Sequence, residues 1–344
     1  MPKPPKMADV AKAAGVSPMT VSRAFRRDTS VGAKTREKVL KIAEDMGYVF
    51  DSRASNLRSQ RTGFVAVTIP SLNNANFADT VRGLNDTLQA AGLQILLGYT
   101  NYDIEEEERL IEQLLQRRPE AIVVTGGHHT ARGRRLLESA GVPVVETWDI
   151  PADPIGYAVG FSNADAMDEL VDHLGGAGVR RLAFVGGDNT GDTRGADRRL
   201  GFLVAAERMG LDYQFFALGP PPVSMHEGAE AMARILDSSE IYDAVVCVSD
   251  LAAFGALTEC QRRGVRVPED IMIAGFGGFD IADLSYPGLT TVDAHSQLIG
   301  EETGKLLATL LRGGGPNGVA QSVSRVEPTL RVSGSTSQRK ARQN

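Results

Sequence analysis

Hydrophobic residues follow two different patterns along the chain, and the change of pattern divides it into two regions. Up to about residue 50 they recur at helical spacing, as in the stripe Val10, Ala11 and Ala14. From Thr62 onward, short apolar runs alternate with amphipathic stretches, which predicts strands alternating with helices. We therefore expect a small all-α head followed by a larger α/β body.

The head is expected to contain three helices. Gly15 ends the first, because glycine readily adopts the left-handed conformation that follows many helices. Ser17 is expected to cap the second helix, and Pro18 occupies its first turn, where a missing N–H does no harm. A third helix is expected over 33–46. Its predicted core stripe is Val39, Leu40, Ile42 and Ala43. This order and spacing are typical of a helix-turn-helix.

The body contains more strand–helix units than one small sheet can hold. Its predicted strands are 64–69, 93–98, 121–125, 142–146, 158–161, 182–185, 244–248 and 271–274. The helices between them are predicted at 77–91, 105–116, 165–174, 199–209, 229–236 and 251–264. A late strand at 289–292 and a helix at 296–311 are expected to cross back to the first subdomain. We predict two doubly wound parallel-sheet subdomains with a cleft between them.

Charge separates the same two regions. Residues 1–61 hold 13 Lys or Arg and 6 Asp or Glu, a net charge of +7. The other 283 residues hold 24 and 37, a net charge of −13. A basic head on an acidic body indicates that the head contacts a polyanion, and a basic helix-turn-helix fits the DNA major groove. A helical bundle used for protein contact is the alternative.

The second helix of the head is expected to read bases. Arg23 suits bidentate recognition of guanine, and Met19 suits contact with a thymine methyl group. Thr20, Thr35 and basic residues at the start of the third helix suit phosphate contacts, which position the domain without reading sequence. The predicted DNA-binding residues of the head are Pro18, Met19, Thr20, Ser22, Arg23, Thr35 and Arg36.

Composition argues against several other classes of protein. Cys247 and Cys260 are not spaced as metal ligands, so we expect no metal, and Cys247 lies in an apolar run, so we expect it to be buried. No apolar run approaches the roughly 20 residues of a membrane span, and no secretory signal is evident, so we expect a cytoplasmic protein. The glycine-rich stretches match no nucleotide-binding or nucleophile-elbow motif, so we expect neither a cofactor nor catalysis. A solute-binding protein without gene control and a sugar-metabolising enzyme remain alternatives.

The head resembles the DNA-binding domain of the LacI/GalR family of transcriptional regulators. The matching segments are ADVAKAAGVS at 8–17, TVSR at 20–23, KTREKV at 34–39 and GY at 47–48. The family's body is similar to periplasmic sugar-binding proteins, which implies subdomains of that type. The expected domains are a DNA-binding head (1–50), a hinge (51–61), an effector-binding and dimerisation body (62–330) and a disordered tail (331–344). Within the body, the two expected subdomains are 62–162 with 293–322, and 163–292 with 323–330.

The resemblance extends into the segment after the head, although two family positions differ. The family continues with a hinge of the form Tyr-x-Pro-Asn-x-x-Ala-x-x-Leu, which implies that 52–59 forms a short helix on operator DNA. Ala54 and Leu57 match this hinge, and Leu57 is expected to wedge into a minor-groove step. Phe50 and Asp51 replace the Pro and Asn, so we expect the chain to approach the hinge more loosely.

Side chains at the predicted strand ends are the expected lining of the cleft, because ligands of such sheets bind beyond the carboxyl ends of the strands. Trp148, the only Trp, either stacks on a sugar or packs in its loop. The resemblance places an arginine in the effector site at the position of Arg198. The family often has an acidic residue near Gly277 and Gly278, and its loss favours an anionic ligand. The expected effector-binding residues are Ser71, Asn76, Phe77, His128, Trp148, Phe161, Arg198, Ser249, Asp250 and Asp280. His128 and its neighbour His129 either line the cleft or lie on an exposed loop.

Within the family, several segments of the body resemble the gluconate-utilisation repressors. They are VVE at 144–146, AVGF at 158–161, ECQR at 259–262 and IAGF at 273–276. The resemblance implies a homodimeric repressor that binds double-stranded operator DNA and responds to a small-molecule effector, gluconate or a related sugar acid. A regulator of the same family for a different sugar is the alternative. The tail has no apolar heptads, so no tetramer-forming helix is expected.

Overall fold

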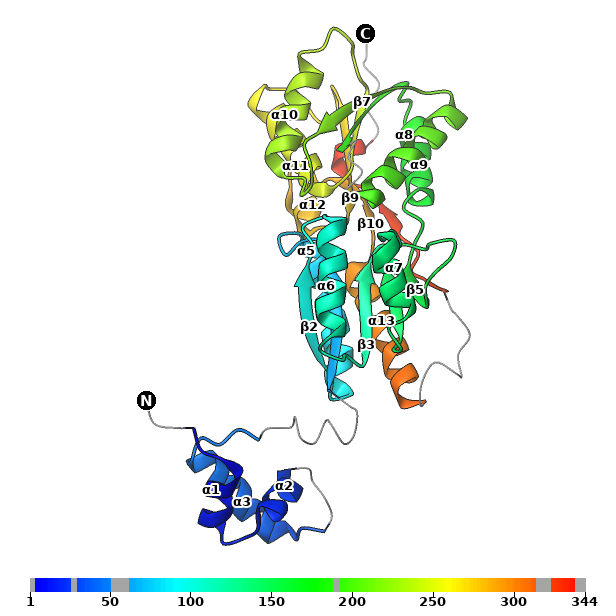
Figure 1. Cartoon of the computed structure of the whole chain (residues 1–344). Helices are drawn as coiled ribbons and strands as arrows, with labels where there is room; N and C mark the ends of the chain where they lie inside the picture. Colours follow the sequence, from blue (N-terminus) through cyan, green and yellow to red (C-terminus); the bar gives the residue numbers. More distant parts are fainter. Residues whose placement is uncertain (1–3, 26–29, 51–61, 188–191, 314–322, 338–344) are drawn as a thin grey trace. The chain divides into compact units, whose positions relative to one another are not determined.

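The computed structural model describes residues 4–25, 30–50, 62–187, 192–313 and 323–337. The chain divides into two compact units, Met1–Thr62 and Gly63–Asn344. The first unit contains the head and the second contains the body (Figure 1). The predicted hinge, with Ala54 and Leu57, lies outside the described residues.

The head is a bundle of α1 (Met7–Ala14), α2 (Pro18–Phe25) and α3 (Ala33–Asp45). As predicted, Gly15 ends α1 with a φ of 67°, and Ser17 Oγ accepts a 3.2 Å hydrogen bond from the backbone N–H of Thr20. The core consists of Val10, Ala11, Ala14, Val21, Ala24, Val31, Val39 and Ala43. The prediction that Leu40 belongs to this core was wrong, because its side chain is 39% exposed. Positions 39 and 43 lie one turn apart and carry the buried stripe of α3, whereas position 40 points about a quarter-turn away.

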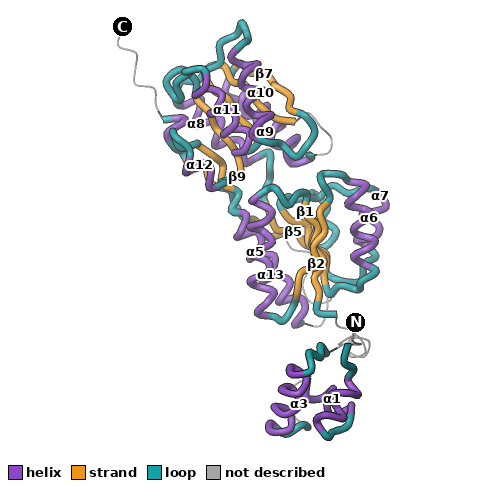
Figure 2. The backbone as a smooth tube through the Cα atoms, turned by 90° about the vertical axis from the view of Figure 1, so that its left-hand side faces the viewer, coloured by secondary structure: helices purple, strands orange, loops and turns teal. Residues whose placement is uncertain are grey.

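The body contains two lobes, each built on a six-stranded sheet. The first lobe has the strand order β11-β5-β4-β3-β1-β2. Its strands are β1 (Phe64–Ile69), β2 (Gln94–Tyr99), β3 (Ala121–Thr125), β4 (Val144–Thr147), β5 (Tyr157–Gly160) and β11 (Val323–Arg325). Its helices are α5 (Ala75–Ala90), α6 (Ile104–Leu115), α7 (Ala131–Glu138) and α13 (Ser296–Arg312). Helices α5 and α13 cover one face of the sheet, and α6 and α7 cover the other (Figure 2).

The second lobe has the order β12-β10-β9-β8-β6-β7. Its strands are β6 (Arg181–Gly187), β7 (Asp212–Leu218), β8 (Ala244–Cys247), β9 (Met272–Gly277), β10 (Thr290–Asp293) and β12 (Thr329–Arg331). Its helices are η1 (Asp165–Met167), α8 (Asp168–Gly176), α9 (Thr193–Met209), α10 (Met225–Leu236), α11 (Asp250–Arg262), α12 (Asp280–Leu284) and η3 (Gly334–Thr336). Figure 1 shows α10 and α11 on one side of the sheet and α8 and α9 on the other. The two lobes confirm the predicted pair of doubly wound sheets.

The two sheets share a topology that fixes where a ligand can bind. In each, the first strand of the lobe lies between the second and the third, so the strand order reverses direction there. Ligands of doubly wound sheets bind beyond the carboxyl ends of the strands at this switch point. The segments concerned follow β1 and β3 in the first lobe and β6 and β8 in the second.

The C-terminal part of the chain differs from the expectation. Strand β10 and helix α13 were both expected to cross to the first lobe. The strand β10 pairs with β9 and stays in the second lobe, so of these two elements only α13 crosses. Residues 323–325 form β11 and pair with β5, so they belong to the first lobe and not the second. After crossing back, β12 runs antiparallel to β10. Three-residue strands carry too short a pattern to show their partner in the sequence.

The residues expected to begin a disordered tail are ordered up to position 337. Arg331 ends β12, and Ser335 and Thr336 are fully buried. Ser335 Oγ accepts a 2.8 Å hydrogen bond from the N–H of Thr290 and donates to the carbonyl of Ile273 at 2.5 Å. The polar composition misled the prediction because these small hydroxyl groups bond to strand backbone rather than to water.

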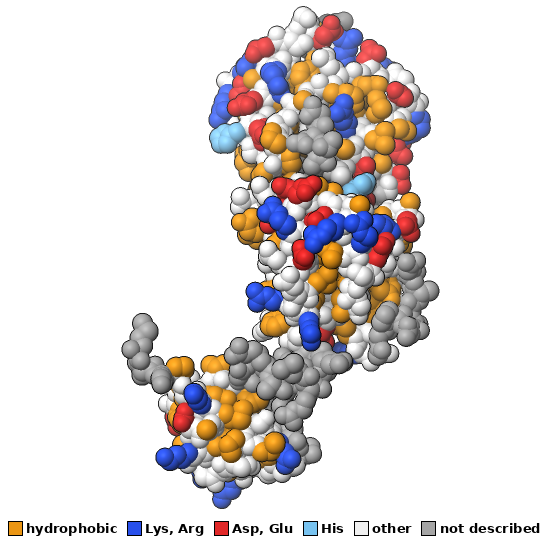
Figure 3. Space-filling view, in the orientation of Figure 1, with side chains coloured by type: hydrophobic (Ala, Val, Ile, Leu, Met, Phe, Trp, Pro, Cys, Tyr) orange, Lys and Arg blue, Asp and Glu red, His pale blue; other side chains and the backbone are white. Residues whose placement is uncertain are grey.

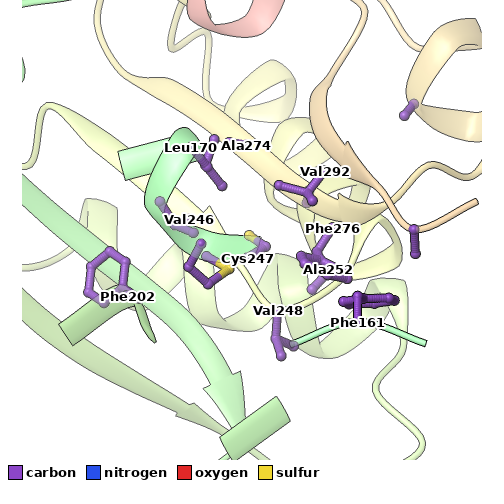
Figure 4. Close-up of a cluster of buried hydrophobic side chains, with 14 of the residues drawn as sticks. Phe161, Leu170, Phe202, Val246, Cys247, Val248, Ala252, Ala274, Phe276 and Val292 are labelled. Carbon is purple, nitrogen blue, oxygen red and sulfur yellow. The ribbon is translucent and has the colours of Figure 1, made fainter. Parts of the chain in front are cut away.

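The core of the second lobe contains Cys247, which the sequence predicts to be buried. Cys247 lies on β8 among Val246, Val248 and Phe276 (Figure 4) and has no exposed surface. Burial raises the pKa of both thiols well above the usual value. The prediction of a buried Cys247 is therefore confirmed. Among the described helices, none is both long and apolar enough to cross a bilayer.

Candidate functional site

The second helix of the head presents the side chains predicted to face DNA. Pro18, Met19 and Arg23 are exposed, and Met19 is 54% exposed although its side chain is apolar. Thr20 and Ser22 are half-buried, and Thr20 shares a 2.9 Å hydroxyl contact with Ser17 at the start of the helix. On the face shown in Figure 3 the head carries many more basic than acidic side chains.

The start of α3 departs in part from its expected role. Gly32 precedes the helix and supplies no side-chain cap, and Thr35 is half-buried. Arg36, predicted to contact phosphate, donates from Nε to the carbonyl oxygen of Ala24 at 3.0 Å. A cation near the last carbonyls of a helix stabilises that end of α2. Arg36 therefore ties the start of α3 to the end of α2.

The chain leaving the head is held by aromatic contacts. Phe50 stacks on Phe25 of α2, with ring centroids 4.9 Å apart and planes 10° apart. Tyr48 meets Phe25 edge-on at 5.9 Å. Phe50 is therefore anchored to the head, whereas Asp51 and the hinge lie outside the described residues, so the expected looser approach to the hinge stays a prediction.

A cavity opens between the lobes at the switch points of the two sheets. Its empty volume is about 550 Å³, and part of it is continuous with solvent. We call it the interlobe cavity. It is lined by Asn74, Asn76, Phe77, Tyr102, Trp148, Asp192, Arg194, Arg198, Pro221, Val223, Val248, Ser249 and Leu251. Five predicted effector residues are among them: Asn76, Phe77, Trp148, Arg198 and Ser249. His128 lines a neighbouring cavity, which shares Tyr102 and Arg194 with the first.

Trp148 forms part of the wall in a strained backbone conformation. Its φ is 71°, which bulky residues adopt only when the surroundings hold them there. Its Nε1 donates to Thr80 Oγ1 at 3.1 Å, and its carbonyl accepts from Asn163 Nδ2 at 3.0 Å. Phe77 meets the indole edge-on at 5.3 Å. The ring is therefore fixed as a rigid aromatic wall.

Arg198 joins the second lobe to the segment around Asn163, where the chain passes from the first lobe to the second. Its Nε donates to Asn163 Oδ1 at 2.9 Å, and Nη1 donates to the carbonyl of Val248 at 3.1 Å. Its guanidinium lies 3.8 Å from the ring centroid of Phe276. Burial lowers the pKa of Arg198 to about 10, so the group stays charged at neutral pH.

Arg194 lies one helical turn before Arg198 and was not predicted. Its side chain projects from the start of α9 and lines both cavities, and the residue is only 6% exposed. The guanidinium lies 5.7 Å from the ring centroid of Phe77. The spacing of four residues is the signal that the sequence offered, because such positions share a helix face.

Carboxylates accompany the two arginines. Asp192 lines the interlobe cavity and caps α9, accepting from the N–H of Gly195 at 3.2 Å. Burial and the nearby Asp149 raise the pKa of Asp197. Burial and the charge of Asp192 raise the pKa of Tyr102, which keeps its hydroxyl protonated. The region thus holds fixed cations beside several hydrogen-bond acceptors.

Four predicted effector residues line neither cavity described above. Ser71 is buried and accepts from the N–H of Asn73 at 3.1 Å, and Phe161 packs in the core. Asp280 is exposed at the start of α12. Asp250 has no exposed surface, and its Oδ2 accepts from the N–H of Phe279 at 2.8 Å. Burial raises the pKa of Asp250 to about 6, although nearby hydrogen-bond donors oppose this shift. Asp250 therefore holds the loop after β9 through a buried hydrogen bond and does not face the interlobe cavity.

The two neighbouring histidines have different environments. His128 is exposed, with Nδ1 at 4.0 Å from Asp149 Oδ2. The His129 side chain is buried, with Nδ1 at 2.8 Å from Glu107 Oε2 and Nε2 at 3.5 Å from Glu146 Oε1. Burial opposes the charged imidazole, but the two carboxylates outweigh it and raise the pKa of His129 to about 9. His129 joins α6, β4 and the loop after β3, and neither expected role describes it.

Comparison with known proteins identifies the family. Residues 6–51 match the bacterial regulatory proteins of the lacI family, and residues 171–336 match the periplasmic binding protein-like domain. The transcriptional regulator GntR of Pseudomonas aeruginosa is 36% identical over 310 residues, covering 90% of each chain. The chain belongs to the LacI family.

Two solved structures of LacI-family regulators from Silicibacter pomeroyi resemble the chain. One is 41% identical, covers 81% of this chain and 99% of its own, and has a TM-score of 0.73. The other is 32% identical, covers 97% and 99%, and has a TM-score of 0.88.

Membership of the family confirms the predicted fold and the main function. The protein is a DNA-binding transcriptional repressor of the LacI family. Its relatives are transcriptional regulators and not enzymes, in line with the expectation for this chain. The interlobe cavity is lined by five of the residues that the sequence predicts to bind an effector.

Proposed function

We propose that this LacI-family repressor senses gluconate or a related sugar acid in its interlobe cavity, and that the effector changes its affinity for a pseudo-palindromic operator. The combination of two arginines with hydroxyl-binding groups in one cavity carries this proposal. A carboxylate pairs well with a guanidinium, whereas sugar hydroxyls need acceptors and amides. Asn74, Asn76 and Asp192 supply the latter beside Arg194 and Arg198.

The aromatic wall and the loop after β9 support the same ligand class. Phe77 and Trp148 present apolar surface on which the carbon chain of a polyol can lie. Gly277 and Gly278 stand where an acidic side chain is common in the family, so that position adds no negative charge. The resemblance to gluconate-utilisation repressors and the similarity to GntR of P. aeruginosa agree with an acidic effector. A different sugar within the family is the alternative.

The head is proposed to dock with α2 in the major groove, with Arg23 and Met19 on base edges and Leu57 of the hinge in the minor groove. A homodimer places two such heads on the two halves of the operator. A DNA-bound role places the protein in the cytoplasm.

Calorimetry on the full-length protein tests the effector class. The titrants are gluconate, 6-phosphogluconate, ribose and a purine nucleoside. We expect heat from gluconate or its phosphate and none from the neutral compounds. Binding of only a neutral compound would refute the sugar-acid proposal.

Fluorescence anisotropy on duplexes selected from a randomised pool tests the DNA side. We expect effector-dependent binding that weakens with salt as phosphate contacts are screened. Leu57→Ala is expected to weaken operator binding while calorimetric effector affinity stays unchanged. If this variant and the unmodified chain bind the operator with equal affinity, Leu57 does not act as a wedge. Sedimentation of the unmodified chain measures whether it is a dimer.

A further inference from the structure

The two arginines of the interlobe cavity differ in how far their hydrogen bonds are already used. Arg198 bonds through Nε to Asn163 and through Nη1 to the carbonyl of Val248, and it stacks on Phe276. Those partners come from the lobe crossing and from the second lobe, so they hold the guanidinium in place. Two of the three guanidinium nitrogens of Arg198 therefore already donate hydrogen bonds within the protein, which leaves few donors for a ligand.

Arg194 has the opposite arrangement. Although the residue is 94% buried, its guanidinium forms no hydrogen bond or ion pair with any described residue. The guanidinium lies over the face of Phe77, 5.7 Å from the ring centroid. Because no described residue uses the five N–H donors of this guanidinium, they are available to a ligand that enters the cavity.

The backbone of the first lobe leaves space for this side chain. A Cβ atom at Gly126 would lie 2.9 Å from Arg194 Nη1, closer than a side chain can normally approach. Gly126 also has a φ of 98°, which favours glycine. Because Arg194 comes from the second lobe and Gly126 from the end of β3, the guanidinium reaches across the lobe boundary at the point where the two cavities meet.

We infer that Arg194 is the residue that selects a carboxylate-bearing effector, whereas Arg198 orders the wall and the lobe crossing. This inference rests on the proposed sugar-acid function and assigns the charge recognition within that site. The carboxylate of the ligand accepts two hydrogen bonds from the guanidinium of Arg194, and the hydroxyl groups contact Asn74, Asn76 and Asp192. Arg194 is thus a specificity-determining residue that the family motif around Arg198 does not mark.

The test compares two ligands that differ only in charge. D-gluconate and D-gluconamide share the same carbon chain and hydroxyl groups, but the amide is neutral. Calorimetry on the full-length chain measures both ligands against the unmodified protein, Arg194→Met and a matched control, Arg199→Met. Arg199 is on the same helix, but its guanidinium lies over Phe215, 4.3 Å from the ring centroid, and it does not line the interlobe cavity. Arg194→Gln provides a second neutral side chain if the Met variant fails to fold.

We expect Arg194→Met to weaken gluconate binding by roughly 10- to 100-fold, the usual value of a hydrogen-bonded charge pair. Gluconamide affinity should change little, so that the preference for the acid disappears, while Arg199→Met keeps it. If Arg194→Met retains the preference for gluconate, the inference is overturned and the proposed function stands. If the unmodified protein binds neither ligand, the proposed function fails and the inference falls with it.

Discussion

The head and the interlobe cavity use side chains in opposite ways. In the head, the groups proposed to read DNA stand exposed on one short helix, and the core beneath them consists of small apolar residues. In the cavity, the proposed recognition groups are largely buried and come from segments spread from Asn74 to Leu251. Exposed groups cost the fold little when they are changed, whereas buried charges must be satisfied by the fold or by a ligand.

This difference predicts where substitutions change stability and where they change only binding. Around the cavity, removing one member of a buried charged group leaves its partners unpaired. On α2, removing an exposed side chain leaves the head folded and alters only DNA contacts. The variants below test that separation, beginning with the largest expected effect.

His129→Ala is expected to destabilise the body by about 3–5 kcal/mol, because Glu107 and Glu146 would remain buried without their cationic partner. Urea denaturation followed by the fluorescence of Trp148 measures this, since the only Trp lies in the body. His128→Ala, one residue away and exposed, is the control and should change stability by less than about 0.5 kcal/mol. Equal effects of the two variants would contradict the buried ion group.

The same group gives a pH dependence of known sign. The pKa of His129 is raised to about 9 in the folded protein, so its stabilising contribution is complete below the unfolded pKa, near about 6.5, and disappears as pH rises through 9. Denaturation from pH 6 to pH 10 should show this loss in the unmodified chain. His129→Ala should lack it.

Arg23→Ala is expected to weaken binding to the preferred operator by about 1–3 kcal/mol and to relax base preference at one position. The head should stay folded, because Arg23 is exposed, and effector binding should not change. Anisotropy with matched and mismatched duplexes measures the effect. Lys12→Ala, an exposed change on α1, serves as the control. Equal losses on all duplexes would indicate a phosphate contact and not base reading.

Phe50→Ala is expected to lower the stability of the head by about 1 kcal/mol through loss of the stack on Phe25. Calorimetric melting of the full chain separates this change from the unfolding of the body, which should be unaffected. Phe50→Tyr keeps the ring and should keep the stability. A head that melts unchanged in Phe50→Ala would show that the stack contributes nothing.

Lys34→Ala is expected to give the smallest effect. This exposed residue at the start of α3 is expected to contact phosphate, so its loss should reduce the salt dependence of log K by about 1 without changing base preference. Binding titrations from low to moderate salt measure the slope. An altered base preference would place Lys34 among the base-reading residues.

The same contrast explains what the sequence could predict. Spacing on a single helix determines which side chains are exposed, so the α2 surface followed directly from residues 18–25. Continuous apolar runs marked the central strands of both sheets. The outer strand β7 was missed because its buried and partly exposed positions form no clear pattern, and β11 and β12 are too short to show one.

The cavity could be predicted only in part. Arg198 was recognised from its motif, and Arg194 lies one turn away on the same helix face. Tyr102 comes from a loop that no pattern marks. The contacts of His129 join segments 22 and 17 positions away in the chain, Glu107 and Glu146, so only the folded sheet reveals them. Asp250 looked like a ligand-binding residue because it follows a strand, yet the fold turns it inward.

The short strands β11 and β12 determine how far the chain must extend for both sheets to have protected edges. Strands β11 and β12 lie at the outer ends of their sheets, next to β5 and β10. A stop codon shortly before residue 323 would remove both together and leave one edge of β5 and one edge of β10 unpaired. Open strand edges pair readily with other chains, so such a truncation should favour aggregation of both lobes at once. Fifteen described residues near the C-terminus, 323–337, thus protect two separate sheets.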